Sequence, residues 1–187
     1  MLKLLQRSLD QSVPVQIVRT VAPNETLHGI VLDLTRDWVL LTGIRDGGYF
    51  DGYNIVRPTD FRSVETDTRF LPFLREHQAW PPAQPAEPID LSSPSNFISA
   101  AASLAGVVTL FEEARRPDMC WIGSPADWGK KSVWILTIDP DATWDDYMTQ
   151  FKFKHLTRID FADDYNKALV TVAGPKPPPT AEHGQPG

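Results

Sequence analysis

The stretch GSPADWGKKS at residues 123–132 contains the glycines, lysines and hydroxyl group from which phosphate-binding loops are built. Such a loop needs four residues between its glycines, so that backbone N–H groups converge on a phosphate, and then Lys followed by Ser or Thr. Here five residues separate the glycines, Lys131 occupies the hydroxyl position, and Pro125 has no N–H group to donate. We therefore interpret this stretch as a plain loop between two strands.

The acidic stretch DPDATWDDYMTQ at residues 139–150 spaces its carboxylates in a way that suggests calcium. An EF-hand loop, however, requires Gly at its sixth position and Glu at its twelfth. Those positions hold Trp144 and Gln150, so we favour a solvated hairpin.

No set of residues predicts catalysis or a metal centre. The four histidines are scattered without metal-ligand spacing, and a single cysteine, Cys120, cannot supplement them. Ser124 is followed directly by proline, unlike a nucleophile elbow, although a triad assembled from distant positions stays open as an alternative. The apolar run Met-Cys-Trp-Ile predicts that Cys120 is a buried, inert thiol. We predict a protein that is not an enzyme and has no catalytic residue, metal or cofactor.

The run QFKFK at residues 150–154 is the best local case for nucleic acid. In a strand its two lysines share one face and its two phenylalanines share the other, which then faces the core. A solvated strand face is therefore the favoured interpretation, and a basic stripe that contacts RNA is the alternative. The residues of that alternative are Lys152, Lys154 and Arg158, with Lys130 and Lys131 as a further extension.

Aromatic side chains outside the predicted core form the other candidate surface. Exposed Trp and Tyr are frequent anchors of protein interfaces. We expect the contact residues for a protein partner to be Tyr49, Phe50, Tyr53, Trp128 and Trp144.

Two proline-rich stretches divide the chain that must position these residues. Residues 81–94 and 174–187 are too rich in proline for the interior of a sheet or helix. We predict a linker and a flexible tail there, which leaves a first domain at residues 1–80 and a second at 95–173.

The two domains show the same order of predicted elements. In the first, leucines at helical spacing precede strands at about 13–21, 28–35, 37–44, 49–57 and 61–65. In the second, a helix at 95–105 precedes strands at about 107–113, 119–123, 132–139, 147–154 and 156–161. A shift of 95 residues aligns Phe61 with Leu156 and Val64 with Ile159. This indicates an internal duplication; the alternative is two unrelated β domains.

A short helix followed by five short antiparallel strands resembles the Sm-like fold family, whose members form small, strongly bent barrels. The first motif of that family is similar to Gly29-x-Val31-x-x-Leu34 with the later Trp38. The second motif is similar to Asp51-Gly52-Tyr53 with the apolar residues after it, and Gly123 is displaced in the second copy. The resemblance implies a mostly β chain of two tandem Sm-like barrels, each with an N-terminal helix and five bent strands.

The residues that bind RNA in this family are absent from the matching positions. The resemblance places an aspartate and an asparagine where this chain has Thr35 and Val39, and a cation before glycine where it has Asp51. A uridine clasp needs a side-chain amide and a cation. The resemblance therefore implies the fold and its habit of assembly through strand edges, without the RNA site. Two alternatives stay open: the two domains of one chain pair with each other, or several chains close a ring.

The bulk composition is consistent with this interpretation. The net charge of −6 lacks the usual electrostatic signature of a nucleic-acid or lipid partner, and no apolar stretch is long enough to cross a membrane. We predict a cytoplasmic scaffold or binding protein that forms a homo-oligomer and contacts an unidentified protein. The alternative is an RNA-binding protein that uses the basic residues named above.

Overall fold

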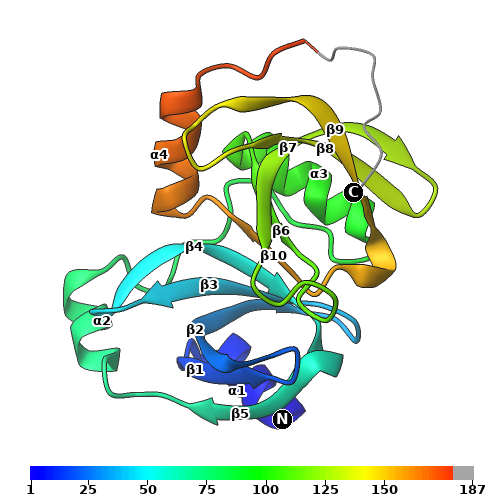
Figure 1. Ribbon diagram of the computed structural model, residues 1–187. Coiled ribbons are helices and arrows are strands. Elements are labelled where there is room, and N and C mark those ends of the chain that lie inside the picture. Colours follow the sequence, from blue (N-terminus) through cyan, green and yellow to red (C-terminus); the bar gives the residue numbers. More distant parts are fainter. Residues whose placement is uncertain (179–187) are drawn as a thin grey trace.

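The computed structural model describes residues 1–178 and shows a mostly β protein. These residues form one ten-stranded antiparallel sheet and four α-helices (Figure 1). None of the helices in this range combines the length and the apolar character that a membrane crossing requires.

The first half of the chain begins with an amphipathic helix and continues into five strands. The elements are α1 (Leu2–Gln11), β1 (Val15–Arg19), β2 (Ala22–Leu34), β3 (Val39–Arg45), β4 (Tyr49–Val56), the short 3₁₀ helix η1 (Pro58–Asp60) and β5 (Phe61–Thr66). Helix α2 (Leu71–His77) follows and was not predicted from the sequence.

The second half repeats this sequence of elements. They are α3 (Pro94–Ala105), β6 (Val108–Phe111), β7 (Cys120–Gly129), β8 (Ser132–Ile138), β9 (Trp144–Lys152), η2 (Phe153–His155) and β10 (Arg158–Phe161), followed by α4 (Asp164–Ala173). The predicted plain loop at 123–131 is wrong, because β7 continues to Gly129 and pairs with β8. Pro125 is tolerated because the ladder shifts register just after it.

The strands lie in the order β5-β1-β2-β3-β4-β10-β6-β7-β8-β9. The first five strands and the last five are thus arranged in the same way, and β4 pairs with β10 where the two sets meet. The prediction of two closed barrels is corrected: the outer edge of β4 is occupied by β10, so the ten strands form one open sheet.

Two glycines occupy matching places in the two sets of strands. Gly29 lies opposite Val15, and Gly123 lies opposite Val108. A Cβ atom at Gly29 would lie 2.5 Å from the Thr42 carbonyl oxygen, and one at Gly123 would lie closer still to a carbonyl of β8. Gly123 is therefore not displaced; the strand pairing restores a match that a constant shift in sequence misses.

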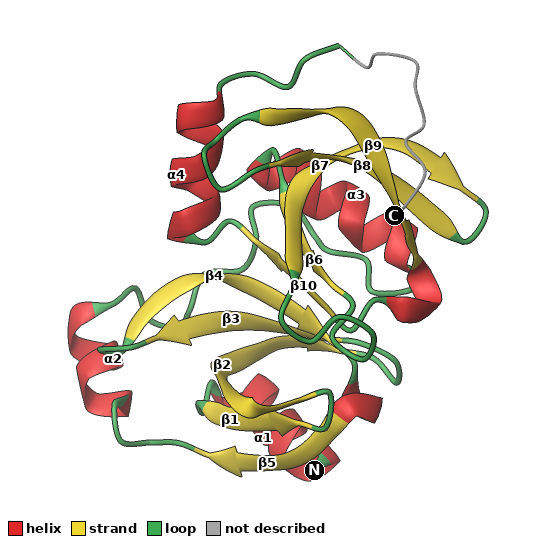
Figure 2. Ribbon diagram, in the orientation of Figure 1, coloured by secondary structure: helices red, strands yellow, loops and turns green. Residues whose placement is uncertain are grey.

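The largest hydrophobic core joins both halves of the chain. Helix α3 packs against β6, β7 and β10 and buries Phe97 and Ile98 completely (Figure 2). Ile55 of the first half belongs to the same core. So do Ile89 and Leu91, which lie in the proline-rich stretch 81–94 and are buried. This stretch therefore packs against the sheet, although it has no regular structure before α3.

Candidate functional site

The junction between β4 and β10, here called the inner seam, shows how these strand edges recognise each other. Asn54 lies opposite Asp160 and donates its Nδ2–H to the Asp160 carboxylate at 2.7 Å. Tyr53 lies opposite Phe161, and their rings stack with centroids 5.1 Å apart. The inner seam thus combines a backbone ladder with one polar and one aromatic side-chain pair.

The dipeptide Asp51-Gly52 fixes one end of the inner seam. Asp51 accepts a hydrogen bond from the backbone N–H of Asp164, at the start of α4, at 2.8 Å. Gly52 has φ +61°, and a Cβ atom there would lie 2.5 Å from the Asp163 nitrogen and 2.6 Å from the Phe161 carbonyl oxygen. The residues that replace the RNA-binding pair of the Sm-like resemblance therefore hold the two halves together.

A network of buried charges also bridges the two halves, and it includes Asp160 of the inner seam. Arg19 is fully buried and donates two hydrogen bonds to Glu113, at 2.5 and 2.7 Å, and one to Glu25 at 2.5 Å. Arg158 donates to Glu25 at 2.7 Å and also contacts Asp160. Desolvation opposes the charged form of Arg158, but the carboxylates of Asp160 and Glu25 raise its pKa. Arg158 was proposed as an RNA contact, yet its guanidinium is engaged in this network.

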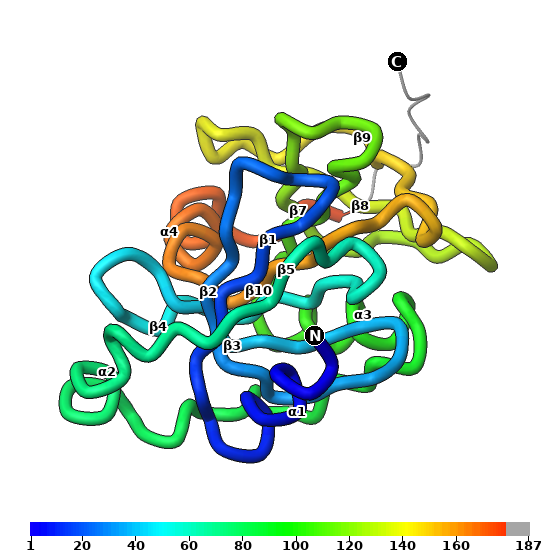
Figure 3. Tube along the Cα trace, turned by 90° about the horizontal axis from the view of Figure 1, so that it is seen from below, coloured from blue at the N-terminus to red at the C-terminus, as the bar shows by residue number. Residues whose placement is uncertain are grey.

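The two strands at the ends of the sheet carry the open edges. Within residues 1–178, β5 pairs only with β1 and β9 pairs only with β8. They lie at opposite ends of the molecule in Figure 1. In the view from below, β5 runs across the near side beside β1 (Figure 3). Unpaired N–H and C=O groups on such edges are competent to pair with another strand.

A basic pocket lies where β9 ends. Its volume is about 440 Å³, and it is lined by Lys131, Ser132, Lys152, Phe153 and Lys154. The backbone N–H of Phe153 donates to the Lys131 carbonyl at 3.0 Å, which joins the β7–β8 turn to η2. Lys152 and Lys154 are exposed, and among the residues that the structure describes no carboxylate lines the pocket. The sequence suggested these lysines as a flat stripe but gave no sign of a cavity.

The five predicted aromatic contact residues do not form one surface. Tyr53 donates to the Ala83 carbonyl, and the Trp144 indole donates to the Gly174 carbonyl, so both are held within the chain. Phe50 is partly buried. Tyr49 and Trp128 are exposed, but Tyr49 packs on Phe73 of α2 in the first half whereas Trp128 belongs to β7 in the second.

Cys120 is exposed, so the prediction of a buried thiol is wrong. It is the first residue of β7, after the loop that follows β6, and it lies opposite Phe111 of β6. Partial desolvation and the nearby Asp160 carboxylate raise the pKa of the thiol, which disfavours the thiolate.

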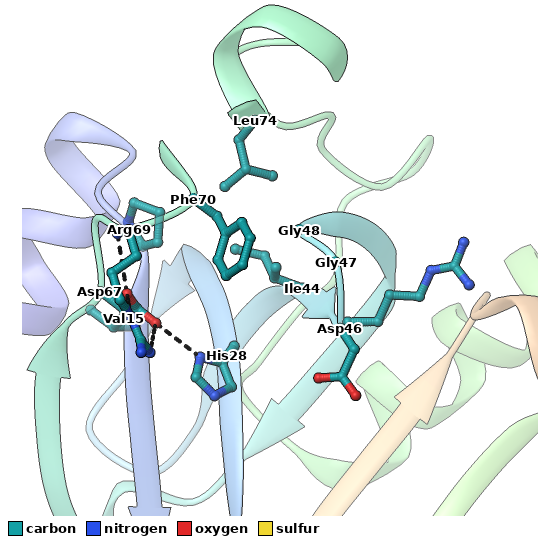
Figure 4. A pocket seen from close by; sticks show the side chains of 12 residues that line it. Val15, His28, Ile44, Asp46, Gly47, Gly48, Asp67, Arg69, Phe70 and Leu74 are labelled. Atoms are coloured by element: carbon teal, nitrogen blue, oxygen red, sulfur yellow. Dashed lines mark hydrogen bonds and ion pairs between the residues drawn. The ribbon is translucent and has the colours of Figure 1, made fainter. Parts of the chain in front are cut away.

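A second cavity, of about 240 Å³, lies between α2 and the β3–β4 turn (Figure 4). Here Asp67 lies between His28, at 3.4 Å, and Arg69, at 2.8 Å, while Phe70 and Leu74 supply an apolar wall. This cavity holds a histidine beside a carboxylate, but Ser, Thr and Cys are absent from the described residues that line it.

We expect the Arg69→Gln variant to titrate Asp67 closer to its ordinary pKa of 3.8. In the wild type the hydrogen bond from Arg69 lowers the Asp67 pKa to about 2, against partial desolvation. Because the folded-state pKa lies below the unfolded one, this pair stabilises the fold above the ordinary pKa. That contribution is lost as the pH falls through the folded pKa. NMR titration of the Asp67 carboxyl carbon measures the shift, and Arg75→Gln is the matched control. An unchanged Asp67 titration in Arg69→Gln would contradict the assignment.

Comparisons with known proteins found no match to this chain. No protein-family model, curated protein or solved structure matches the chain. Within residues 1–178, no group of three or more His, Cys, Asp or Glu side chains is arranged to hold a metal ion. The acidic stretch at 139–150 forms the β8–β9 turn and most of β9.

Proposed function

We propose that the protein is a non-enzymatic scaffold that assembles from copies of itself by pairing β5 of one chain with β9 of the next. The observation that carries this proposal is the inner seam. There β4 and β10 pair, and β9 and β5 are the matching strands of the opposite halves, with their outer edges open. We further propose that each half is a divergent Sm-like unit, on the basis of its helix, its five-strand order and its matching glycines.

The inner seam predicts the register of this outer seam. Val64 lies opposite Ile17 and Ile159 lies opposite Leu110, which makes Val64 the match of Ile159. Arg57 precedes η1 as Lys152 precedes η2, which makes the ends of β4 and β9 equivalent.

Copying the inner register then places Glu65 opposite Thr149, as Asp160 lies opposite Asn54. We expect the Thr149 hydroxyl to donate to Glu65 across the outer seam. Such pairing would satisfy the unpaired backbone N–H and C=O groups of β5 and β9, and the Thr149–Glu65 hydrogen bond would add one polar side-chain contact.

We expect a variant with Glu65→Cys and Thr149→Cys to be linked into a ladder of multimers by a short bismaleimide. The background is Cys120→Ser, because the native thiol is exposed. The two positions lie on the opposite end strands of one chain, so a link between them joins different chains. A mixture of the two single-cysteine variants should stop at dimers. The pair Lys3→Cys and Thr149→Cys, with one site on α1, is the control and should not form the ladder.

Sedimentation velocity provides the independent test of assembly. A protein that stays monomeric across the accessible concentration range, both in buffer alone and with added polyanions, would overturn the scaffold proposal. Proline removes one N–H group, and neighbouring strand residues direct their N–H groups to opposite sides. One of the pair Thr149→Pro and Gln150→Pro should therefore abolish assembly while it preserves the fold.

The basic pocket favours a second candidate function, the binding of single-stranded RNA. Lys131, Lys152 and Lys154 can neutralise phosphates, and Phe153 lines the same cavity. We expect labelled U-rich or A-rich RNA to bind with micromolar affinity that falls steeply as salt rises. Fluorescence anisotropy at two salt concentrations measures this. The Lys152→Ala, Lys154→Ala double variant should lose about tenfold or more in affinity. Absence of binding at low salt would retire this function.

A further inference from the structure

The cation that follows β4 at the inner seam is paired with a carboxylate of its own half. The pocket that holds the matching cation at the end of β9 is lined by no carboxylate of residues 1–178. Arg57 follows β4 and donates to the Lys154 carbonyl across the inner seam at 3.5 Å. Its guanidinium is paired within its own half with Asp60 at 2.8 Å. Asp60 is the last residue of η1, and the last residue of η2 is His155. The position of the carboxylate that balances the cation in the first half is therefore occupied by His155 in the second.

Positive charge accumulates at the end of β9 as a result. Lys152, the match of Arg57, shares its pocket with Lys131 and Lys154, and no carboxylate of residues 1–178 lines that pocket. His155 lies beside them: desolvation, Arg115, Lys154 and Lys152 lower its pKa against the opposing effect of the Glu112 carboxylate, and the net lowering disfavours a further positive charge. This concentration of cations contrasts with the net charge of −6 for the whole chain.

Pairing of β5 with β9 would add another cation to this region. In the register copied from the inner seam, Ser63 lies opposite Phe151, so Arg62 of the next copy lies beside Lys152. The corresponding neighbours at the inner seam are the neutral Thr157 and Arg57, which is already paired. Like charges placed opposite each other across strands destabilise the pairing.

Resting on the assembly proposed above, we propose that a phosphate-bearing anion binds in the basic pocket and controls closure of the outer seam. The anion offsets the repulsion among Lys131, Lys152, Lys154 and the partner copy's Arg62. A volume of about 440 Å³ exceeds that of a single phosphate and accommodates a short chain of them. Each copy thus supplies three lysines to the site, and the neighbouring copy supplies the arginine that completes it.

Sedimentation velocity of the full chain at low salt tests this proposal with four additions. They are buffer alone, inorganic tripolyphosphate, a U-rich RNA oligonucleotide and a morpholino of the same sequence, whose backbone is neutral. We expect assembly to strengthen on the order of tenfold with the phosphate-bearing probes and to be unchanged with the morpholino. A response to tripolyphosphate assigns the ligand as an inorganic phosphate chain. A response to RNA alone assigns it as a nucleic-acid backbone.

The decisive variant is Lys152→Ala, Lys154→Ala. Removal of the repelling charges should let this variant assemble in buffer alone, and the anions should no longer strengthen it. Lys3→Ala, which removes one exposed charge on α1, should behave as the wild type. Loss of both anion response and assembly in the double variant would contradict control by repulsion.

The outcomes separate this inference from the assembly on which it rests. Wild-type protein that assembles equally well with and without anions overturns the inference and leaves the scaffold proposal intact. Protein that remains monomeric and uncrosslinked under every condition overturns both, even where calorimetry detects anion binding.

Discussion

The Gly52→Ala variant will be less stable than the wild type by about 2–4 kcal/mol. Gly52 has φ +61°, a backbone conformation that costs any residue with a Cβ atom. The Cβ would also lie 2.5–2.7 Å from three backbone atoms, the Asp163 nitrogen and Cα and the Phe161 carbonyl oxygen. Backbone atoms cannot move aside as a flexible side chain can, so β10 and the start of α4 must shift from β4. Urea denaturation, read by tryptophan fluorescence, measures the loss.

Gly174→Ala is the matched control for this experiment. Gly174 has φ +74° and ψ −166°, and a Cβ there would meet no atom of residues 1–178 within 4 Å. Its substitution therefore measures the cost of a backbone conformation that essentially only glycine adopts, without a contact, on the order of 1–3 kcal/mol. Equal losses in the two variants would show that contact between β4 and the β10–α4 connection is not the cause.

The Arg19→Met variant will lose about 3–5 kcal/mol, because it strands a buried carboxylate. Arg19 is fully buried, and the side chain of its bidentate partner Glu113 is 4% exposed. Methionine fills much of the same space, but it leaves Glu113 without its hydrogen bonds. Glu25, whose side chain is 45% exposed, can turn toward water and contributes little to the loss. Chemical denaturation at neutral pH measures the effect.

The double variant Arg19→Met, Glu113→Leu distinguishes the loss of the Arg19–Glu113 ion pair from the effect of altered packing around Arg19. Removal of both charges together avoids the stranded carboxylate, so we expect this variant to recover most of the lost stability. A double variant as unstable as Arg19→Met would contradict this explanation and indicate that packing around Arg19 is responsible.

Local patterns in the sequence predicted most of the elements. The apolar alternation and turn residues placed five strands in each half, but β2 begins at Ala22 rather than at 28, and β7 continues to Gly129 rather than ending at 123. Helix α2 was not predicted, and for Asp163-Asp164 the sequence left open an exposed turn or the start of a helix, of which the helix is observed. Asp163 caps α4 by accepting from the Asn166 backbone N–H at 2.8 Å, so the paired aspartates at its start were the available signal.

The joining of the halves was foreseen only as one option, because it depends on residues far apart in the chain. Arg19 and Glu113 are 94 residues apart, and Arg158 and Glu25 are 133 apart. Neither pair is visible in a periodic pattern. The basic pocket was predicted only in part for the same reason. Alternation along the predicted strand identifies Lys152 and Lys154, but Lys131 joins them through a contact made by the β7–β8 turn.

The pairing of β4 with β10 within one polypeptide also determines how dilution would act on an assembly. A covalent connection makes the inner seam independent of protein concentration, whereas a seam between chains weakens as the protein is diluted. Because β5 and β9 have different sequences, each chain also has two unlike ends. An assembly built through these two ends is directional, because each contact joins β5 of one chain to β9 of the next. It always contains an even number of five-stranded units, because every chain contributes two. Selection can then alter one end without altering the other.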